Sequence, residues 1–219
     1  MSQYEHLRMD RDERGVVTVT IDVRDRSMNV FNEAVMEELD RVAARLEQDD
    51  AAKLVLFRSG KASGFMAGAD LFPLREMTQP DQVDTVLRQG QDVFNRIAAL
   101  PVPTVAAIHG PCLGGGLEFA LACDHRVARQ DSATRIGLPE TQLGLIPGWG
   151  GTQRLPGCIG VSTAIRMILT GERVTAVRAK QLGLVDAVVD PEQFDDGLSQ
   201  YVNDLLAGGR PAGVPQGWR

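Results

Sequence analysis

A chain of 219 residues with 43% hydrophobic and 24% charged residues can bury one sizeable core and has the composition of a globular protein. Its net charge of −6 and its 5% aromatic content argue against nucleic acid as the main partner, because such a surface needs clustered cations and stacking side chains. No apolar run is long enough to span a bilayer, and the three cysteines form no CxxC pair. The sequence predicts a cytoplasmic protein without a disulfide framework.

The N-terminal half alternates between strand and helix patterns. The segment 16–23 alternates apolar and polar residues, whereas 53–58 is a short continuous apolar run typical of a strand buried on both faces. Asn32 is a predicted helix N-cap, and Pro101 ends a second helix. The predicted strands are 6–9, 16–23, 53–58 and 104–108, and the predicted helices are 32–46 and 80–100.

The C-terminal half continues the alternation with shorter elements around a glycine-rich bend at 146–152. The predicted strands are 126–128, 135–136 and 184–189, and the predicted helices are 115–122, 162–169, 176–182 and 191–206. The whole pattern is a loosely repeating β-β-α unit of the α/β class, without the strict alternation of a dinucleotide-binding fold. We expect one domain over residues 1–207, followed by a Gly/Pro-rich tail or linker over 208–219.

Two glycine turns are each followed by a glutamate. Gly114-Gly115-Gly116 precedes Glu118, and Gly137 precedes Glu140 at the same spacing of three from a glycine. The flanks of Glu118 are apolar, so we expect this carboxylate to be buried, which is costly unless the group is paired or used. The neighbours of Glu140 are polar, and this pattern fits a solvated residue as well as a functional one. The pair indicates acid–base chemistry on a carbonyl compound.

Other arrangements fit known chemistry less well. Asp124 and His125 lie beside Cys123, but adjacent strand residues point to opposite faces. The sequence contains no nucleophile elbow, no phosphate-binding loop, no dinucleotide fingerprint and no His/Asp cluster with metal-ligand spacing. We therefore expect chemistry without a metal or a resident cofactor.

Several stretches together resemble the enoyl-CoA hydratase/isomerase (crotonase) superfamily, in order and spacing, through most of residues 15–190. The most similar branch is the N-terminal hydratase domain of the multifunctional fatty-acid oxidation α-subunit. The matching stretches are 65–70, 107–110, 113–118, 137–140, 145–148, 150–156 and 182–185.

This resemblance implies a crotonase (ClpP-like) spiral of ββα units, with a C-terminal helical part that we expect to be truncated at Arg219. It also implies that backbone N–H groups of Ala69 and Gly115 stabilise the enolate of an acyl-CoA thioester. Glu118 would deprotonate the attacking water, and Glu140 would protonate the α-carbon. The implied reaction is hydration of trans-2-enoyl-CoA to (3S)-3-hydroxyacyl-CoA in fatty-acid β-oxidation, with coenzyme A only as part of the substrate.

The resemblance also implies a set of contacts with the substrate. After Asp70 the family commonly has a lysine that contacts the CoA phosphates, whereas this chain has Leu71, so that contact must come from elsewhere. Loop arginines are the candidates, although such arginines are often simply solvated. The implied substrate and CoA contacts are Arg24, Arg26, Met28, Ala67, Gly68, Asp70, Leu71, Gly114, Pro139 and Gly148.

Two alternatives stay open. The first is a Δ3-Δ2 enoyl-CoA isomerase, which is also conceivable as a side activity, and the second is a weakly active acyl-CoA-binding module of a larger polypeptide. The family's assembly implies a homo-oligomer, a trimer or hexamer, or a part of a multifunctional β-oxidation polypeptide. No nucleic acid and no membrane span are expected.

Overall fold

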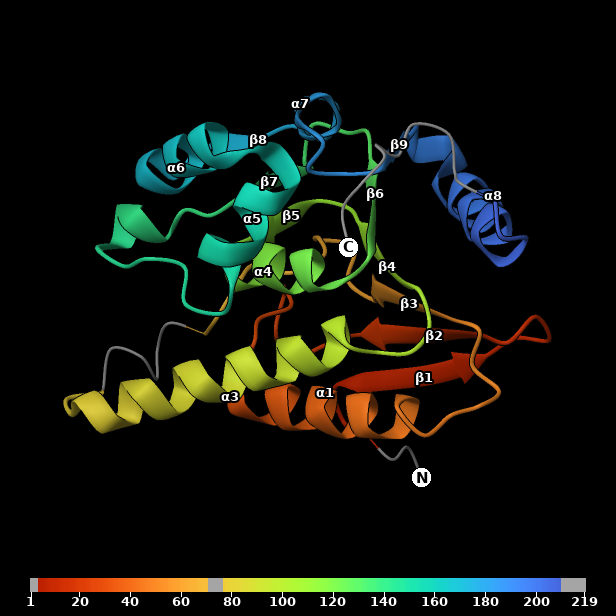
Figure 1. Cartoon of the computed structure of the whole chain (residues 1–219), viewed down its shortest axis with the longest axis horizontal. Coiled ribbons are helices and arrows are strands. Elements are labelled where there is room, and N and C mark those ends of the chain that lie inside the picture. The colour runs from red at the N-terminus through yellow and green to blue at the C-terminus, as the bar shows by residue number, and fades with distance from the viewer. Residues whose placement is uncertain (1–3, 71–76, 210–219) are drawn as a thin grey trace.

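A six-stranded sheet is the main layer of the computed structural model, which describes residues 4–70 and 77–209. The strand order is β1-β2-β3-β4-β6-β9, and neighbouring strands are parallel except for the antiparallel pair β1 and β2 (Figure 1). The strands are β1 Leu7–Arg11, β2 Val16–Ile21, β3 Leu54–Ser59, β4 Thr104–Ile108, β6 His125–Arg129 and β9 Ala187–Val189.

A second, small sheet has the order β5-β7-β8. Its strands are β5 Pro111–Leu113, β7 Arg135–Gly137 and β8 Arg173–Val174. A strand of the large sheet is twice followed directly by a strand of the small one, β4 by β5 and β6 by β7, before the chain turns into a helix. This is the ββα repeat that the sequence predicts.

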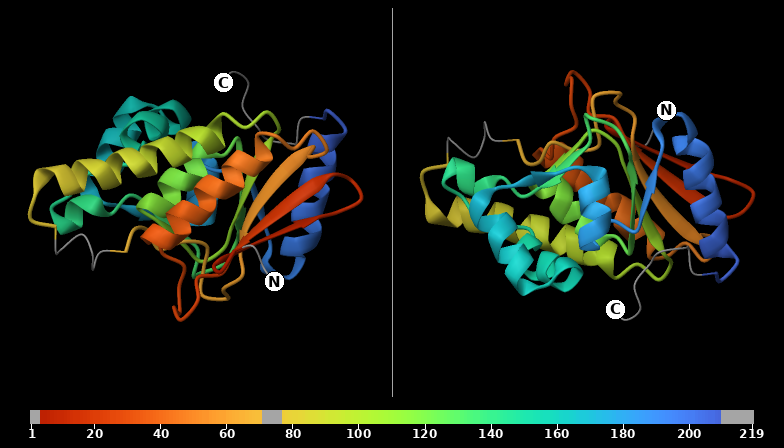
Figure 2. Two further views of the ribbon diagram at one scale, coloured as in Figure 1. Left: turned by 90° about the horizontal axis from the view of Figure 1, so that it is seen from below. Right: turned by 90° about the horizontal axis from the view of Figure 1, so that it is seen from above.

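Helices cover both faces of the large sheet. Figure 2 shows α8 on one side of the strands and α1, α3 and α4 on the other, while α5, α6 and α7 lie over the small sheet in Figure 1. The α-helices are α1 Glu33–Leu46, α3 Pro80–Ala98, α4 Gly115–Ala122, α5 Gly151–Ile159, α6 Val161–Thr170, α7 Ala176–Leu182 and α8 Phe194–Leu206, and the 3₁₀ helices are η1 Glu140–Leu143 and η2 Pro191–Gln193.

The apolar run in β3 is explained by this double cover. Val55 and Phe57 belong to the main core beneath α1 and α4, whereas Leu54 and Leu56 belong to a separate core beneath α8. Alternate side chains of a strand point to opposite faces, so a strand covered on both sides must be apolar throughout. The predicted N-cap is also confirmed, since the Asn32 side chain accepts a hydrogen bond from the Val35 amide at 2.9 Å.

Four elements, α5, β5, β8 and β9, differ from the sequence prediction. The bend at 146–152 runs directly into helix α5, which contains Pro156 although proline removes a helical hydrogen bond. Strands β5 and β8, of three and two residues, were not predicted, because pairing across the small sheet defines them rather than local pattern. The predicted strand 184–189 is shortened to β9, since the Leu184 amide caps α7 by bonding the Ala179 carbonyl.

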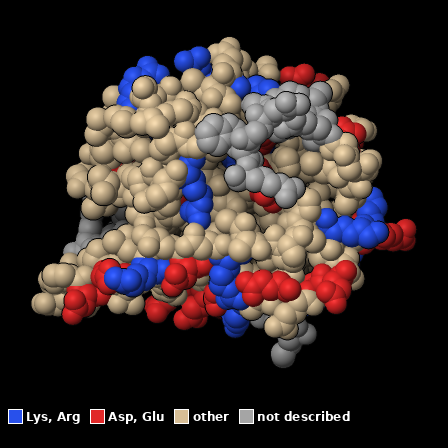
Figure 3. Space-filling view, viewed as in Figure 1, with Lys and Arg blue, Asp and Glu red and all other residues tan. Residues whose placement is uncertain are grey.

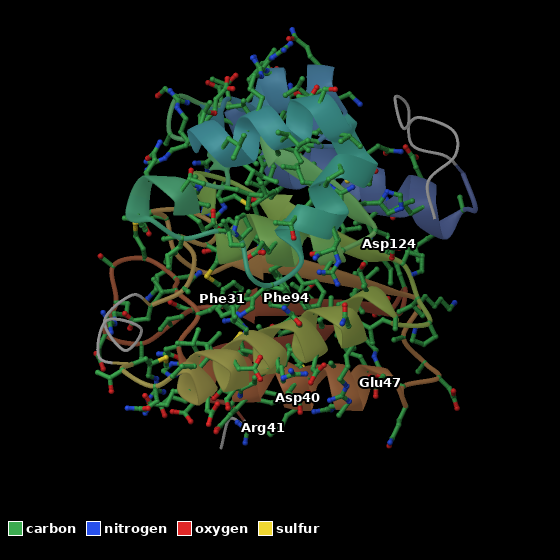
Figure 4. All side chains as sticks on the ribbon, turned by 60° about the vertical axis from the view of Figure 1, so that its left-hand side comes forward. Phe31, Asp40, Arg41, Glu47, Phe94 and Asp124 are labelled. Atoms are coloured by element: carbon green, nitrogen blue, oxygen red, sulfur yellow. The ribbon has the colours of Figure 1, made fainter. Side chains whose placement is uncertain are left out.

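An aromatic cluster lies beneath the glycine turn of α4. Phe31 packs edge-on against Phe94, Phe119 and Trp149, with ring centroids 5.4, 5.8 and 5.8 Å away. Figure 4 shows Phe31 and Phe94 near the middle of the molecule, above α3. Edge-to-face packing of this kind favours one arrangement of the rings over others. The cluster therefore gives the start of α4 a rigid base.

Charges on one face are mixed rather than segregated. Figure 3 shows acidic and basic side chains interleaved along the lower edge, over α1 and α3. Arg96 bridges Asp40 of α1 and the C-cap residue Glu47, and Arg88 pairs with Asp84 within α3. Pairs of opposite sign cancel most of the field outside this face, which therefore lacks the single-sign stripe of a nucleic-acid-binding surface.

Candidate active site

The glycine turn before α4 takes a conformation that other residues avoid. Gly114 has φ +52° and ψ −127°, and a Cβ added to it would lie 3.1 Å from Oε1 of Glu140. Its amide donates to the Gly137 carbonyl at 2.9 Å, so the two predicted glycine units lie side by side. Glycine at position 114 thus lets the backbone turn sharply and brings the second glutamate against the start of α4.

Two amides at this turn carry no hydrogen bond. Within residues 4–70 and 77–209, the N–H groups of Ala69 and Gly115 donate to no acceptor, whereas the amides of Asp70 and Gly114 donate to the carbonyls of Phe31 and Gly137. Gly68, with φ +113°, lets the segment that contains Ala69 lie close to the start of α4, since a Cβ at Gly68 would lie 3.7 Å from the Gly115 nitrogen. Gly115 is also the first residue of α4, where the helix dipole favours negative charge. The pair is suited to hold a carbonyl oxygen that gains charge.

Glu118 is the buried carboxylate that the apolar flanks predict. It is 2% exposed, and its Oε1 accepts hydrogen bonds from the amides of Trp149 at 2.7 Å and Gly151 at 2.8 Å. Gly151 is the first residue of α5, so the carboxylate sits at a helix N-terminus. Burial raises the pKa of Glu118, while the two amides and the charge of Arg154 lower it. Oε1 is fixed, and Oε2 is left for other partners.

Glu140 differs from Glu118 in its hydrogen bonding, although burial raises the pKa of both carboxyls above the ordinary value. It begins η1 and is half-buried, and its Oε2 is buried without a hydrogen-bond partner among the described residues. Burial raises its pKa to about 7, and the charge of Glu118 adds to the shift. An unpaired buried oxygen favours the neutral acid, because ionisation there is not compensated by donors. One glutamate is thus held as an acceptor and the other is poised to donate a proton.

The raised pKa of Glu140 predicts a pH dependence of stability. The folded state binds this proton more tightly than the unfolded chain, whose Glu has a pKa near 4.5. The stabilisation is therefore fully present below pH 4.5 and is lost as the pH rises through about 7. The Gln of Glu140→Gln does not ionise, so the variant lacks this loss. The melting temperature of the variant minus that of the parent protein should therefore increase from pH 4.5 to pH 8. Thermal melts of both proteins across that range check it; curves that stay parallel would contradict the assignment.

A profile of the Enoyl-CoA hydratase/isomerase family matches residues 11–212, which includes every residue of the site just described. The chain belongs to the enoyl-CoA hydratase/isomerase family. The fatty acid oxidation complex subunit alpha of Vibrio vulnificus is 45% identical over 202 residues, which are 92% of this chain and 29% of that protein. The corresponding subunit of Idiomarina loihiensis is 47% identical over 189 residues, 86% of this chain and 27% of its own length. The chain thus spans less than a third of these relatives.

Solved structures agree with this family. An enoyl-CoA hydratase from Bacillus anthracis superposes with a TM-score of 0.84 at 33% identity, covering 94% of this chain and 78% of that one. One from Mycobacterium smegmatis superposes with a TM-score of 0.86 at 32% identity, covering 93% and 77%. The predicted crotonase fold is therefore confirmed.

The predicted CoA contacts include residues of the loop before α1. The structure places the side chains of Arg24 and Arg26 against different partners. Arg26 donates to the Asp70 side chain at 2.8 Å. Arg24 is directed elsewhere, 3.8 Å from Glu5. Met28 is half-buried in the same loop, and Leu71 lies outside the described residues. The charge of Arg26 is shared with Asp70, and the contacts of either arginine with CoA phosphates stay predictions.

The remaining predicted contacts lie in backbone segments that are tied to neighbouring elements. Ala67 donates its amide to the Asn29 carbonyl at 2.9 Å, and Pro139 precedes η1. Gly148 lies against α3, because a Cβ there would come 2.4 Å from a Leu87 methyl carbon. These positions therefore fix the backbone around the site, and their contacts with a substrate stay predictions.

The sequence reasoning missed the groups that hold Glu118. Trp149 and Gly151 act through backbone amides, which leave only a glycine-rich bend in the sequence. Arg154, in the same family stretch, was given no role. Buried Asn29 was missed as well, although its amide bonds the Ile21 carbonyl and the Ser59 hydroxyl and so ties the loop to the sheet.

The residues that the structure describes offer neither a metal-binding cluster nor a membrane-spanning helix. No group of three or more His, Cys, Asp or Glu side chains among them is arranged to hold a metal ion. None of the helices they form has both the length and the apolar character needed to cross a membrane.

Proposed function

We propose that this chain hydrates trans-2-enoyl-CoA thioesters to (3S)-3-hydroxyacyl-CoA as a step of fatty-acid β-oxidation. The observation that carries the proposal is the meeting of four groups at one turn: two unbonded amides, one acceptor carboxylate and one carboxyl with a raised pKa. Acyl thioesters need an oxyanion site when charge develops on the carbonyl oxygen, and water addition needs a base and an acid.

In the proposed reaction the thioester oxygen accepts hydrogen bonds from the amides of Ala69 and Gly115. Glu118 removes a proton from water as the water oxygen bonds to the β-carbon, and the electrons of the double bond move to the thioester oxygen. The enolate then collapses as Glu140 gives its proton to the α-carbon. One water is added across the double bond, and the two glutamates exchange roles in dehydration.

Hydration of crotonyl-CoA is the direct test. We expect loss of the enoyl-thioester absorbance and formation of 3-hydroxybutyryl-CoA of the S configuration, which a chiral separation of the product identifies. Tight binding of crotonyl-CoA by calorimetry, without turnover, would contradict hydration and favour the binding-module alternative. Binding and turnover both absent would remove the acyl-CoA assignment altogether.

Isomerisation of 3-enoyl-CoA is the second candidate. It is favoured by one observation, the raised pKa and unpaired oxygen of Glu140, because a carboxyl near neutrality can both take and return a proton. Isomerisation needs no added water, so a 3-enoyl-CoA substrate in ¹⁸O-labelled water separates the two reactions. An isomerase converts the 3-enoyl-CoA to unlabelled 2-enoyl-CoA. A hydratase without isomerase activity leaves the 3-enoyl-CoA unchanged and incorporates the label only when 2-enoyl-CoA is supplied.

A further inference from the structure

Arg154 lies behind the turn that holds Glu118. It is in the first turn of α5, and its guanidinium donates to the Trp149 carbonyl at 3.1 Å and to the Asn95 side-chain oxygen of α3 at 2.6 Å. One side chain therefore ties the turn 149–151 to α3. The amides of that turn are the two donors to Glu118.

Helices disfavour a positive charge near the N-terminus, yet Arg154 lies in the first turn of α5. A positive charge in the first turn of a helix opposes the helix dipole, and half-burial lowers the pKa of Arg154 further. The opposing influence is the charge of Glu118, which raises the pKa of Arg154, as Arg154 lowers that of Glu118. Such a conflict between local rule and structure is typical of functional positions.

The backbone of the turn also makes room for the guanidinium. Gly150 has φ +110°, and a Cβ added there would lie 2.1 Å from an Arg154 terminal nitrogen. Only glycine both adopts this conformation easily and leaves the space. The turn is thus shaped around Arg154 as well as around Glu118.

We propose that Arg154 is the positioning residue for Glu118, fixing the turn 149–151 on α3 and presenting a positive charge to the carboxylate that the turn holds. The inference rests on the proposed role of Glu118 as the base. Arg154 acts from behind the amides and touches no reacting atom.

The charged and titratable groups around this pair are few. Within the described residues, Arg154 faces Glu118 from α5, and Glu140 faces it from η1. The buried thiol of Cys123 lies near Arg154 at the end of α4. From α3, Asn95 contacts Arg154, while Phe94 packs on Trp149. Arg154 is therefore the one positive charge among the groups found to act on Glu118.

The test compares substitutions of Arg154 that remove or keep the charge. Arg154→Met and Arg154→Gln are neutral, and the amide of Gln can still donate one hydrogen bond; Arg154→Lys keeps the charge but not the forked contact. In both neutral variants we expect the acidic limb of kcat/KM for crotonyl-CoA to move up by about one pH unit, with about tenfold lower kcat/KM on that limb. In Arg154→Lys the limb should stay in place while kcat falls.

Arg96→Met is the matched control. Arg96 also joins two elements through its guanidinium, α3 to α1, but away from Glu118. We expect lower thermal stability with an unmoved acidic limb. A purely structural role of Arg154 would give its neutral variants the behaviour of this control.

A second readout does not depend on turnover. The ¹³C-labelled side-chain carboxyl of Glu118, assigned by its loss in Glu118→Gln, is titrated by NMR in each folded variant. A raised midpoint in both neutral variants supports the proposal, even if the parent protein proves not to hydrate enoyl-CoA and the proposed function fails. An unchanged midpoint in a folded neutral variant overturns the proposal, whatever the activity.

Discussion

Glu118→Gln is expected to lower kcat for crotonyl-CoA hydration by about a thousandfold, within the range of positioned general bases. The glutamine oxygen can still accept hydrogen bonds from the Trp149 and Gly151 amides, so the turn stays in place and only basicity is lost. Steady-state kinetics at saturating substrate measures the effect. KM should change far less than kcat, because the amides that hold the thioester are untouched.

Glu140→Gln tests the acid in the same assay. We expect a loss of about a hundredfold or more in kcat. The parent protein should lose kcat/KM as the pH rises past about 7, and this loss should disappear in the variant. The two carboxyls influence each other, so the measured limbs belong to the pair. Glu37→Gln, at an exposed position on α1, is the matched control and should keep parental kinetics. Full activity in the Glu118→Gln, Glu140→Gln double variant would end the acid–base assignment.

The parts of the fold that the sequence predicts are those with a local physical signature. Alternation in β2 places Val17, Val19 and Ile21 in the main core, and the Asn32 cap starts α1. Helix α5 lacks such a signature, since it contains both proline and glycine and is stabilised by packing against α4 and α6. Very short strands fail for the same reason, because pairing partners distant in sequence define them.

The candidate site divides in the same way. Apolar flanks predict the burial of Glu118, because a helix apolar on all sides must be covered. Glu140 has polar neighbours in sequence, and its carboxyl lies against Gly114, which is distant in the chain. The role of backbone amides at Trp149 could not be predicted, because every residue except proline has such an amide. Sequence finds side chains suited to chemistry, whereas tertiary packing decides their protonation.

Gly115→Ala is expected to lower kcat by about a hundredfold to a thousandfold, the range seen when an oxyanion donor is lost. The alanine keeps its N–H, but its Cβ would lie 2.7 Å from Cζ3 of the Trp149 ring, closer than packed carbons approach. Either the start of α4 or the indole must move, and displacement of about 1 Å at a reacting centre costs about a hundredfold. Trp149 also donates to Glu118, so one methyl group disturbs both the oxyanion site and the base.

Gly68→Ala disturbs the amide pair from the other side and separates these effects. Its Cβ would lie 3.1 Å from the Leu113 carbonyl oxygen and 3.7 Å from the Gly115 nitrogen, with no contact to Trp149. We therefore expect a comparable fall in kcat for hydration, for isomerisation and for α-proton exchange of a saturated acyl-CoA, because all three pass through the same enolate. Gly157→Ala on α5, where a Cβ meets nothing within 4 Å, is the control and should leave kcat unchanged. If both site variants fold normally and keep parental rates, the two amides do not hold the enolate, and its charge must be stabilised elsewhere.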